Sequence, residues 1–216
     1  DIAVYPATSA NTLSVAEYVI TTAAMLLRGA YGRRAEMEAG DWPRAEAGRG
    51  REIAGKTLGL IGYGEIARAT ARLGAAMGMD CLASDPYAEE FPGAVEGTEE
   101  EVLTKGDVVT LHVPLTEETR GLISADVLAG MKAGAVLINA ARGGVVDEAA
   151  LCEALRSGHL GGAALDVFER EPLADGGRFE GVPNLILTPH IGGVTAEANA
   201  RVSEMTARRV AEHLGV

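Results

Sequence analysis

The feature of this sequence that most constrains its fold is a regular alternation, from Lys56 onward, of short apolar segments with segments of helical periodicity. Short continuous apolar segments bounded by Gly, Pro or polar residues are typical of strands that are buried on both faces. We predict strands at residues 57–61, 79–84, 108–111, 135–138, 162–165 and 185–187. We predict helices after residue 64, from Thr98, at 124–131, at 147–157 and from about Thr195 to the end. The alternation predicts an α/β fold in which helices cover both faces of a parallel sheet, giving three αβα layers.

The first fifty residues follow a different pattern. Residues 1–12 are interpreted as a short strand leading into a loop, and Ser14-Val15-Ala16-Glu17 as a capping box that begins a long helix. That helix is apolar through Val19, Ala23, Leu26 and Leu27. It is too apolar for a solvated helix, so we expect it to pack on another domain or another subunit.

A glycine turn, Gly62-Tyr63-Gly64-Glu65-Ile66-Ala67, joins the first of these strands to a helix. In such a turn Gly62 permits the tight bend, Gly64 lets backbone N–H groups approach a pyrophosphate, and Ala67 is small enough for helix–strand packing. Asp85 follows the second strand, where a carboxylate accepts hydrogen bonds from the ribose hydroxyls of NAD and repels the phosphate of NADP. The turn could also serve compactness alone, with Asp85 a solvated acid. Since strand, helix and spacing agree, we predict a Rossmann-type doubly wound sheet that binds NAD.

Composition excludes several classes of partner. The net charge of −12 opposes binding to nucleic acid or to an anionic membrane surface. The sequence shows no signal peptide and no apolar segment long enough to span a bilayer, and its two cysteines, Cys81 and Cys152, form no metal motif. We therefore expect a cytoplasmic protein without a metal site.

Polar residues follow the predicted strands, at the sheet edge where ligands of open α/β sheets bind. They are Asp85, His112 to Pro114, Asn139 to Arg142, Asp166 and His190. The guanidinium of Arg142, flanked by small residues, suits a substrate carboxylate. The imidazole of His190 suits the proton transfer that accompanies reduction of a ketone. Glu169 and Glu171 are both candidates for the carboxylate that orients this imidazole, and spacing does not choose between them.

With these motifs in order, the sequence resembles the D-isomer-specific 2-hydroxyacid dehydrogenases, and phosphoglycerate dehydrogenases in particular. The resemblance rests on Ser14-Val15-Ala16-Glu17, the glycine turn with Asp85, Leu111-His112-Val113-Pro114-Leu115-Thr116, Asn139-Ala140-Ala141-Arg142-Gly143-Gly144-Val145-Val146-Asp147, Asp166-Val167-Phe168-Glu169-Arg170-Glu171-Pro172 and Thr188-Pro189-His190-Ile191-Gly192-Gly193.

The resemblance implies a function and a set of roles. It implies hydride transfer between NAD(H) and a small D-2-hydroxy or 2-oxo acid of the phosphoglycerate, hydroxypyruvate/glyoxylate or sulfolactate type. The catalytic residues would be Arg142, Glu171 and His190, where the Glu directly before Pro172 is selected over Glu169. The cofactor-binding residues would be Gly62, Gly64, Glu65, Ile66, Asp85, Val113, Pro114, Thr119, Ala140, Ala141, Arg142, Asp166, His190, Gly192 and Gly193, with Asp166 facing the nicotinamide amide.

The resemblance also implies a domain organisation. Residues 1–12 would be the remnant of a substrate domain and its hinge, 13–190 the NAD-binding domain, and 191–216 a hinge and a helix returning to the substrate domain. Because most of the substrate domain would precede residue 1, we expect these 216 residues to bind NAD and to turn over 2-oxo acids poorly or not at all. Members of the family tend to form homodimers, here through helix 14–31 and the arm around Trp42.

Two other functions share part of this pattern. An NAD(H)-sensing binding protein, like the transcriptional corepressors of the same family, can keep the same Arg, Glu and His. Another Rossmann enzyme, such as an alanine dehydrogenase, does not explain the joint presence of Arg142, Glu171 and His190.

Overall fold

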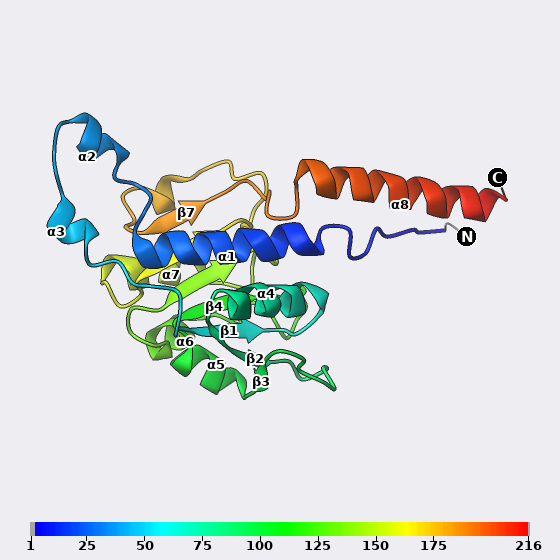
Figure 1. Cartoon of the computed structure of the whole chain (residues 1–216), viewed down its shortest axis with the longest axis horizontal. Helices are drawn as coiled ribbons and strands as arrows, with labels where there is room; N and C mark the ends of the chain where they lie inside the picture. Colours follow the sequence, from blue (N-terminus) through cyan, green and yellow to red (C-terminus); the bar gives the residue numbers. More distant parts are fainter. Residues whose placement is uncertain (1–2, 216) are drawn as a thin grey trace.

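The computed structural model describes residues 3–215 and centres on a seven-stranded parallel sheet (Figure 1). The strand order is β3-β2-β1-β4-β5-β6-β7. The first strand, β1, therefore lies inside the sheet, and later strands are added outward on both of its sides. This confirms the predicted doubly wound α/β fold. The strands are β1 (Thr57–Ile61), β2 (Asp80–Ser84), β3 (Val95–Glu96), β4 (Val108–Leu111), β5 (Val136–Asn139), β6 (Gly162–Leu165) and β7 (Leu185–Leu187). Only the two-residue β3 was not predicted, since it is too short to leave an apolar pattern.

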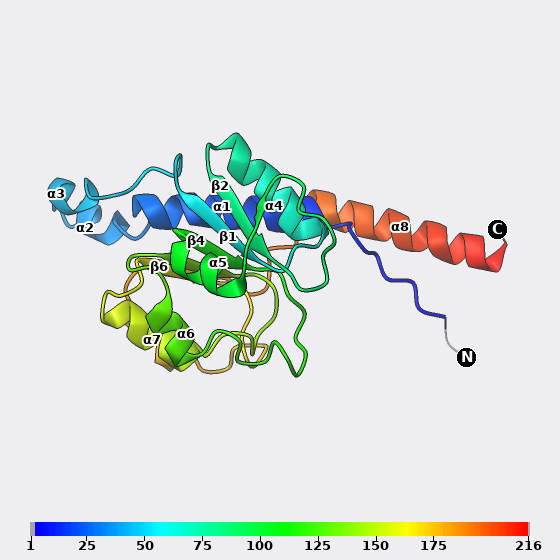
Figure 2. The same cartoon turned by 90° about the horizontal axis from the view of Figure 1, so that it is seen from below.

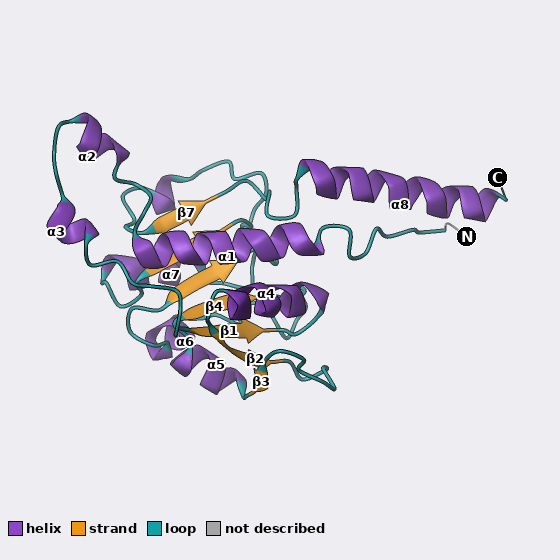
Figure 3. Ribbon diagram, viewed as in Figure 1, coloured by secondary structure: helices purple, strands orange, loops and turns teal. Residues whose placement is uncertain are grey.

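Helices cover both faces of this sheet (Figures 2 and 3). On one face lie α1 (Thr12–Arg28) and α4 (Glu65–Ala76), and on the other lie α5 (Glu99–Lys105), α6 (Ala125–Gly130) and α7 (Glu148–Arg156). Successive residues of β1 alternate between the two cores: Leu58 and Leu60 face α1 and α4, whereas Ile61 faces the other layer. The sheet therefore holds two separate apolar cores, one on each face.

Side-chain caps fix the starts of four helices as their sequences predict. The Thr98 hydroxyl accepts the Glu101 N–H and the Glu101 carboxylate accepts the Thr98 N–H, which makes a capping box at α5. Ser124, Asp147 and Thr195 cap α6, α7 and α8 (Ala196–Leu214) by accepting one backbone N–H each from the first turn of the helix.

The interpretation of Ser14-Val15-Ala16-Glu17 as a capping box was wrong. The helix begins at Thr12, so Ser14 lies inside its first turn and is buried. Its hydroxyl shares a 3.1 Å hydrogen bond with the Thr195 hydroxyl, 181 positions away in the sequence. The Ser14 hydroxyl, which the local pattern predicts to cap the helix, therefore makes a tertiary contact with Thr195 instead. The short strand predicted in residues 1–12 was also wrong for residues 3–11, which form a loop and a turn leading into α1.

We expected the apolar helix to pack on another domain or subunit, but its apolar residues are buried within its own chain. Val19 and Ala23 are fully buried and Leu26 and Leu27 nearly so, all within the core that α1 forms with α4 and the sheet of its own chain. The helix is apolar because it is one of the covering layers of the sheet.

Two segments project from this body at opposite ends (Figure 1). The arm at residues 30–50 contains α2 (Arg34–Glu38) and α3 (Arg44–Ala47), neither of which buries a residue. At the other end α8 extends outward and buries only Ala198, while the first described residues run beside it through a ring contact of Tyr5 with His213. No helix among the described residues is long and apolar enough to cross a membrane.

Candidate active site

The glycine turn places the amino terminus of α4 at the carboxyl edge of the sheet. Gly62 has φ +86°, and a Cβ there would lie 2.7 Å from the His112 carbonyl oxygen, so both conformation and space require glycine. At Gly64, which precedes the first residue of α4, a Cβ would meet no atom within 4 Å. A pocket of about 280 Å³ opens here and is lined by Thr8, Ser9, Asn11, Thr12, Gly64, Glu65, Ile66, Ala67 and His112. Free N–H groups at a helix start beside open space fit the pyrophosphate of a dinucleotide.

Asp85 is fixed beside this turn. One of its carboxylate oxygens accepts the Tyr63 N–H at 2.6 Å and the other accepts the Tyr87 N–H at 2.8 Å. A carboxylate has about four acceptor positions, so two remain for ribose hydroxyls. The turn and the acid predicted to bind the same nucleotide are thus directly hydrogen-bonded to each other.

The loop after β5 presents Arg142. Within this loop the Asn139 side chain accepts the Ala141 N–H at 3.1 Å and donates to the Arg142 carbonyl at 3.0 Å. The Arg142 side chain is exposed and donates to the Ala141 carbonyl oxygen, while Ala140 and Ala141 are partly buried against the two cores.

His190 and Glu171 form the central pair of the site. The His190 Nδ1 lies 2.7 Å from the Glu171 Oε2, and the other Glu171 oxygen accepts the Phe168 N–H at 3.0 Å. Burial opposes ionisation of Glu171, but the hydrogen bonds from His190 and Phe168 and the charge of Arg142 together hold its pKa below the usual range. The ionised carboxylate only accepts, so the Nδ1 carries the proton and the Nε2 faces away from the pair. Glu169 instead contacts Arg178, so the structure brings Glu171 to the imidazole and leaves Glu169 elsewhere.

Asp166 holds the loop that carries His190 through hydrogen bonds. Its carboxylate accepts the Thr188 hydroxyl at 2.6 Å, the Ile191 N–H at 2.8 Å and the Gly192 N–H at 2.7 Å. Gly193 lies against the Asn11 side chain. Asp166, Gly192 and Gly193 thus lie at the carboxyl edge of the sheet, as predicted. The Asp166 carboxylate is hydrogen-bonded to groups of its own chain.

The remaining predicted residues line the adjoining loop after β4. The Thr119 hydroxyl donates to the Pro114 carbonyl at 2.5 Å and accepts the Thr116 N–H at 2.8 Å. Val113 packs beneath Gly62. His112 lines the pocket at the α4 terminus, and burial lowers its pKa to about 4, so it stays neutral at physiological pH.

Comparison with known proteins decides the family. The NAD-binding domain of the D-isomer-specific 2-hydroxyacid dehydrogenases matches residues 20–192. The chain belongs to this family. Among curated relatives, it is 52% identical to the (S)-sulfolactate dehydrogenase of Chromohalobacter salexigens, over the whole of this chain and 71% of that protein. It is 41% identical to the D-3-phosphoglycerate dehydrogenase of Bacillus subtilis, over 97% of this chain and 40% of that protein.

Solved structures of NAD-dependent enzymes superpose closely on this chain. The NAD-dependent formate dehydrogenase of Staphylococcus aureus in complex with NAD matches with a TM-score of 0.88 at 32% identity, over 96% of this chain and 63% of that one. The D-lactate dehydrogenase of Lactobacillus jensenii with NAD⁺ matches with a TM-score of 0.85 at 33% identity, over 93% of this chain and 65% of that one. The chain thus spans less than two thirds of these solved proteins and less than half of the B. subtilis enzyme. NAD is the cofactor of this domain, as the sequence predicts.

Two features that hold the dehydrogenase site together were not among the predicted residues. Glu148, at the start of α7, is buried and accepts the Glu169 N–H at 2.6 Å, while Arg178 bridges it to Glu169. At Gly143 a Cβ would lie 1.7 Å from the Phe168 carbonyl oxygen, so the Arg142 loop and the Glu171 loop touch backbone to backbone. In the sequence, Glu148 looks like an ordinary acidic residue in the first turn of a helix. The need for glycine at position 143 is explained only by the close approach of the Phe168 backbone, which the sequence does not reveal.

An apolar pocket of about 630 Å³ adjoins the His190–Glu171 pair. It is lined by Phe168, Glu171, Pro172, Leu173, Leu187, Thr188, Pro189 and His190. Among the residues that the structure describes, no group of three or more His, Cys, Asp or Glu side chains is arranged to hold a metal ion.

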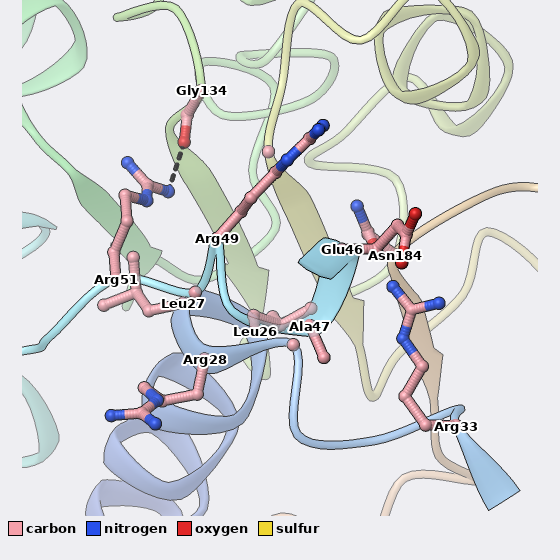
Figure 4. A pocket seen from close by; sticks show the side chains of 13 residues that line it. Leu26, Leu27, Arg28, Arg33, Glu46, Ala47, Arg49, Arg51, Gly134 and Asn184 are labelled. Carbon is pink, nitrogen blue, oxygen red and sulfur yellow. Dashed lines mark hydrogen bonds between the residues drawn. The ribbon is translucent and has the colours of Figure 1, made fainter. Parts of the chain in front are cut away.

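A second hollow lies at the opposite edge of the sheet, where the arm meets the body (Figure 4). Arg51 donates there to the Gly134 carbonyl at 2.5 Å, and its backbone N–H donates to the Leu27 carbonyl at 2.8 Å. Arg28, Arg33 and Arg49 also line this hollow. Since ligands of open α/β sheets bind beyond the carboxyl ends of the strands, we assign this hollow to the attachment of the arm and not to the cofactor.

Proposed function

We propose that the protein is an NAD-dependent dehydrogenase that transfers hydride between NAD(H) and a small D-2-hydroxy or 2-oxo acid. The observation that carries this proposal is the 2.7 Å contact between His190 and Glu171, with Arg142 close enough to lower the pKa of Glu171. An acid/base pair beside a carboxylate-binding cation, at the edge where α4 receives a dinucleotide, is the set that reduction of a 2-oxo acid needs.

In this mechanism each residue has one task. The α4 terminus holds the pyrophosphate and Asp85 holds the adenosine ribose. Bound NADH supplies the hydride. Arg142 binds and orients the substrate carboxylate through its guanidinium. The proton for the carbonyl oxygen comes from the His190 Nε2, because Nδ1 is occupied by Glu171, which orients the ring.

We propose a substrate of the sulfolactate, phosphoglycerate or hydroxypyruvate/glyoxylate type. The relatives named for sulfolactate and phosphoglycerate, with a hydroxypyruvate reductase of Thermotoga maritima at 40% identity over 96% of this chain, support this class. All of these acids carry a carboxylate beside the reacting carbon, which is the group that Arg142 is placed to bind.

The test is turnover by the full-length gene product with NADH and a panel of these 2-oxo acids, beside its His190→Ala variant. We expect the variant to lose turnover and to keep its affinity for NADH. Unchanged turnover in His190→Ala would overturn the assignment of the acid/base. NADH binding by the unsubstituted protein without turnover of any acid in the panel would favour the NAD(H)-sensing alternative.

We also propose a cytoplasmic homodimer that contacts itself through α1 and the arm around Trp42. The buried residues of α1 give no support to this, but the arm does: α2 and α3 bury nothing, and Trp42 is 75% exposed. A solvent-exposed Trp on a projecting arm is typical of an interface. Sedimentation of the unsubstituted protein and of Trp42→Ser tests this, with a shift to monomer expected in the variant. Two free cysteines fit a reducing compartment.

The predicted domain boundaries remain a proposal. The projection of α8, which buries only Ala198, supports a hinge after residue 190.

A further inference from the structure

The loop that carries His190 is held in an unfavourable conformation. His190 has φ +56°, a left-handed value that residues with a Cβ rarely adopt. Its N–H donates to the carbonyl oxygens of Asp166 and Thr188, at 2.8 and 3.0 Å. Since such a conformation persists only when its surroundings impose it, the groups that hold residues 188–192 decide where the imidazole stands.

Tyr18 of α1 contacts this loop at both of its ends. Its hydroxyl lies 2.7 Å from the Thr188 hydroxyl. Its ring packs on Gly192, with two ring carbons 3.5 Å from the position of a Cβ there. Tyr18 thus contacts the loop at Thr188 and Gly192, whereas Glu171 contacts the imidazole of His190 itself.

The direction of the hydrogen bonds follows from the proton count. The Thr188 hydroxyl has a single proton and donates it to the Asp166 carboxylate at 2.6 Å. The Tyr18 hydroxyl must therefore donate to Thr188, which gives a chain from Tyr18 through Thr188 to Asp166. Each donor in such a chain polarises the next, so the chain is stiffer than its separate bonds. Burial raises the pKa of Tyr18 to about 12, so the donor keeps its proton over the working pH range.

We infer that Tyr18 is a positioning residue for the dehydrogenation: through Thr188 and Gly192 it fixes the loop that presents His190 to the substrate. The inference rests on the proposed function of His190. Tyr18 lies outside the glycine turn and its contacts, so its removal acts on the loop that carries His190 and leaves the pyrophosphate and ribose contacts of that turn in place.

Tyr18→Phe removes only the hydroxyl, and Tyr31→Phe is its matched control. Tyr31 is also partly buried, burial raises its pKa to about 12 too, and its hydroxyl has no hydrogen-bond partner among the described residues. Thr188→Val breaks the same chain one step further on. We expect Tyr18→Phe to lower kcat by roughly tenfold, because misplacing a reacting group by about 1 Å costs up to ~10²-fold. The Kd for NADH should change by a smaller factor than kcat, because the contacts of the glycine turn and Asp85 are not altered. The double variant Tyr18→Phe/Thr188→Val should lose no more than Thr188→Val alone, since both break one chain.

The second readout needs no substrate. With only four histidines in the chain, the ring signals of His190 can be followed by NMR after isotope labelling and assigned with a His190→Gln variant. We expect these signals to move or broaden in Tyr18→Phe and to keep their positions in Tyr31→Phe. Unchanged His190 signals in Tyr18→Phe would overturn the inference, and so would moved signals with unchanged kcat. Absence of turnover in the unsubstituted protein would refute the proposed function instead, and the NMR comparison would still decide whether Tyr18 fixes His190.

Discussion

Replacing Gly143 by alanine tests how tightly the loop that carries Arg142 is joined to the loop that carries Glu171. A Cβ at this position would lie 1.7 Å from the Phe168 carbonyl oxygen and 2.2 Å from its carbonyl carbon. An ordinary contact is about 3.5 Å, so the two backbones must separate by about 1.8 Å. No side-chain rotation relieves a clash with backbone. The separation would strain the 2.6 Å bond from Glu169 to Glu148 and the 3.0 Å bond from Phe168 to Glu171.

The magnitude follows from these losses. Overpacking costs about 1–3 kcal/mol and each hydrogen bond to a carboxylate about 1.5–3 kcal/mol, part of which relaxation recovers. We expect the free energy of unfolding to fall by about 3–5 kcal/mol. For a chain of this size that lowers Tm by roughly 6–20 °C. Thermal unfolding followed by circular dichroism measures the shift, and NADH titration shows whether the α4 turn survives.

Gly130→Ala is the control for this substitution. Gly130 ends α6, lies outside the left-handed region, and a Cβ there would meet nothing within 4 Å. Alanine in a helix is favoured over glycine by about 1 kcal/mol, so Tm should stay or rise slightly. If Gly143→Ala melted within about 2 °C of the unsubstituted protein, a shift worth less than ~1 kcal/mol, the backbone contact between the loops would be refuted.

Two further predictions concern the cofactor and the pH dependence of stability. Asp85→Ser combined with Pro86→Arg should shift the ratio of NADH to NADPH affinity toward NADPH by at least roughly tenfold, because a charge-assisted bond is lost and a repulsion removed; an unchanged ratio in fluorescence titrations would contradict the role of Asp85. Asp107 is paired with Lys132 at 2.9 Å, and although burial opposes it, this pairing and the Thr57 N–H hold its pKa below the usual range. A lowered folded-state pKa stabilises the protein above the unfolded-state pKa and loses that contribution as pH falls through the folded value. Lys132→Met should therefore cost about 1 kcal/mol in urea unfolding at pH 7 and progressively less below about pH 4, whereas a cost independent of pH would point to packing alone.

The sequence predicts the sheet well because its strands are buried on both faces. Continuous apolar segments such as Val108–Leu111 and Gly162–Leu165 have the predicted ends, since strands that both layers cover are made mainly of apolar residues. The sequence also predicts the helix starts at Thr98, Ser124, Asp147 and Thr195, because each capping side chain bonds a backbone N–H only three residues away.

The errors and omissions at Ser14, Glu171, Glu148 and Tyr18 depend on contacts between distant segments. Ser14 looks like a cap until Thr195 is found beside it. Spacing could not choose between Glu169 and Glu171, because the choice depends on where His190 returns to the edge. Glu148 and Tyr18 left no signal in their own neighbourhoods, since each acts on a loop that lies far away in the sequence.

The central claim is that this edge of the sheet joins NAD to the reduction of a 2-oxo acid with His190 as the proton donor. Its most direct test supplies the full-length gene product with NADH deuterated at C4 of the nicotinamide and with a 2-oxo acid from the panel. NMR and mass spectrometry then locate the label in the product. We predict deuterium at C2 of a D-2-hydroxy acid, and none when His190→Ala replaces the unsubstituted protein. A hydroxy acid without deuterium at C2, or the same labelled product from His190→Ala, would contradict the account.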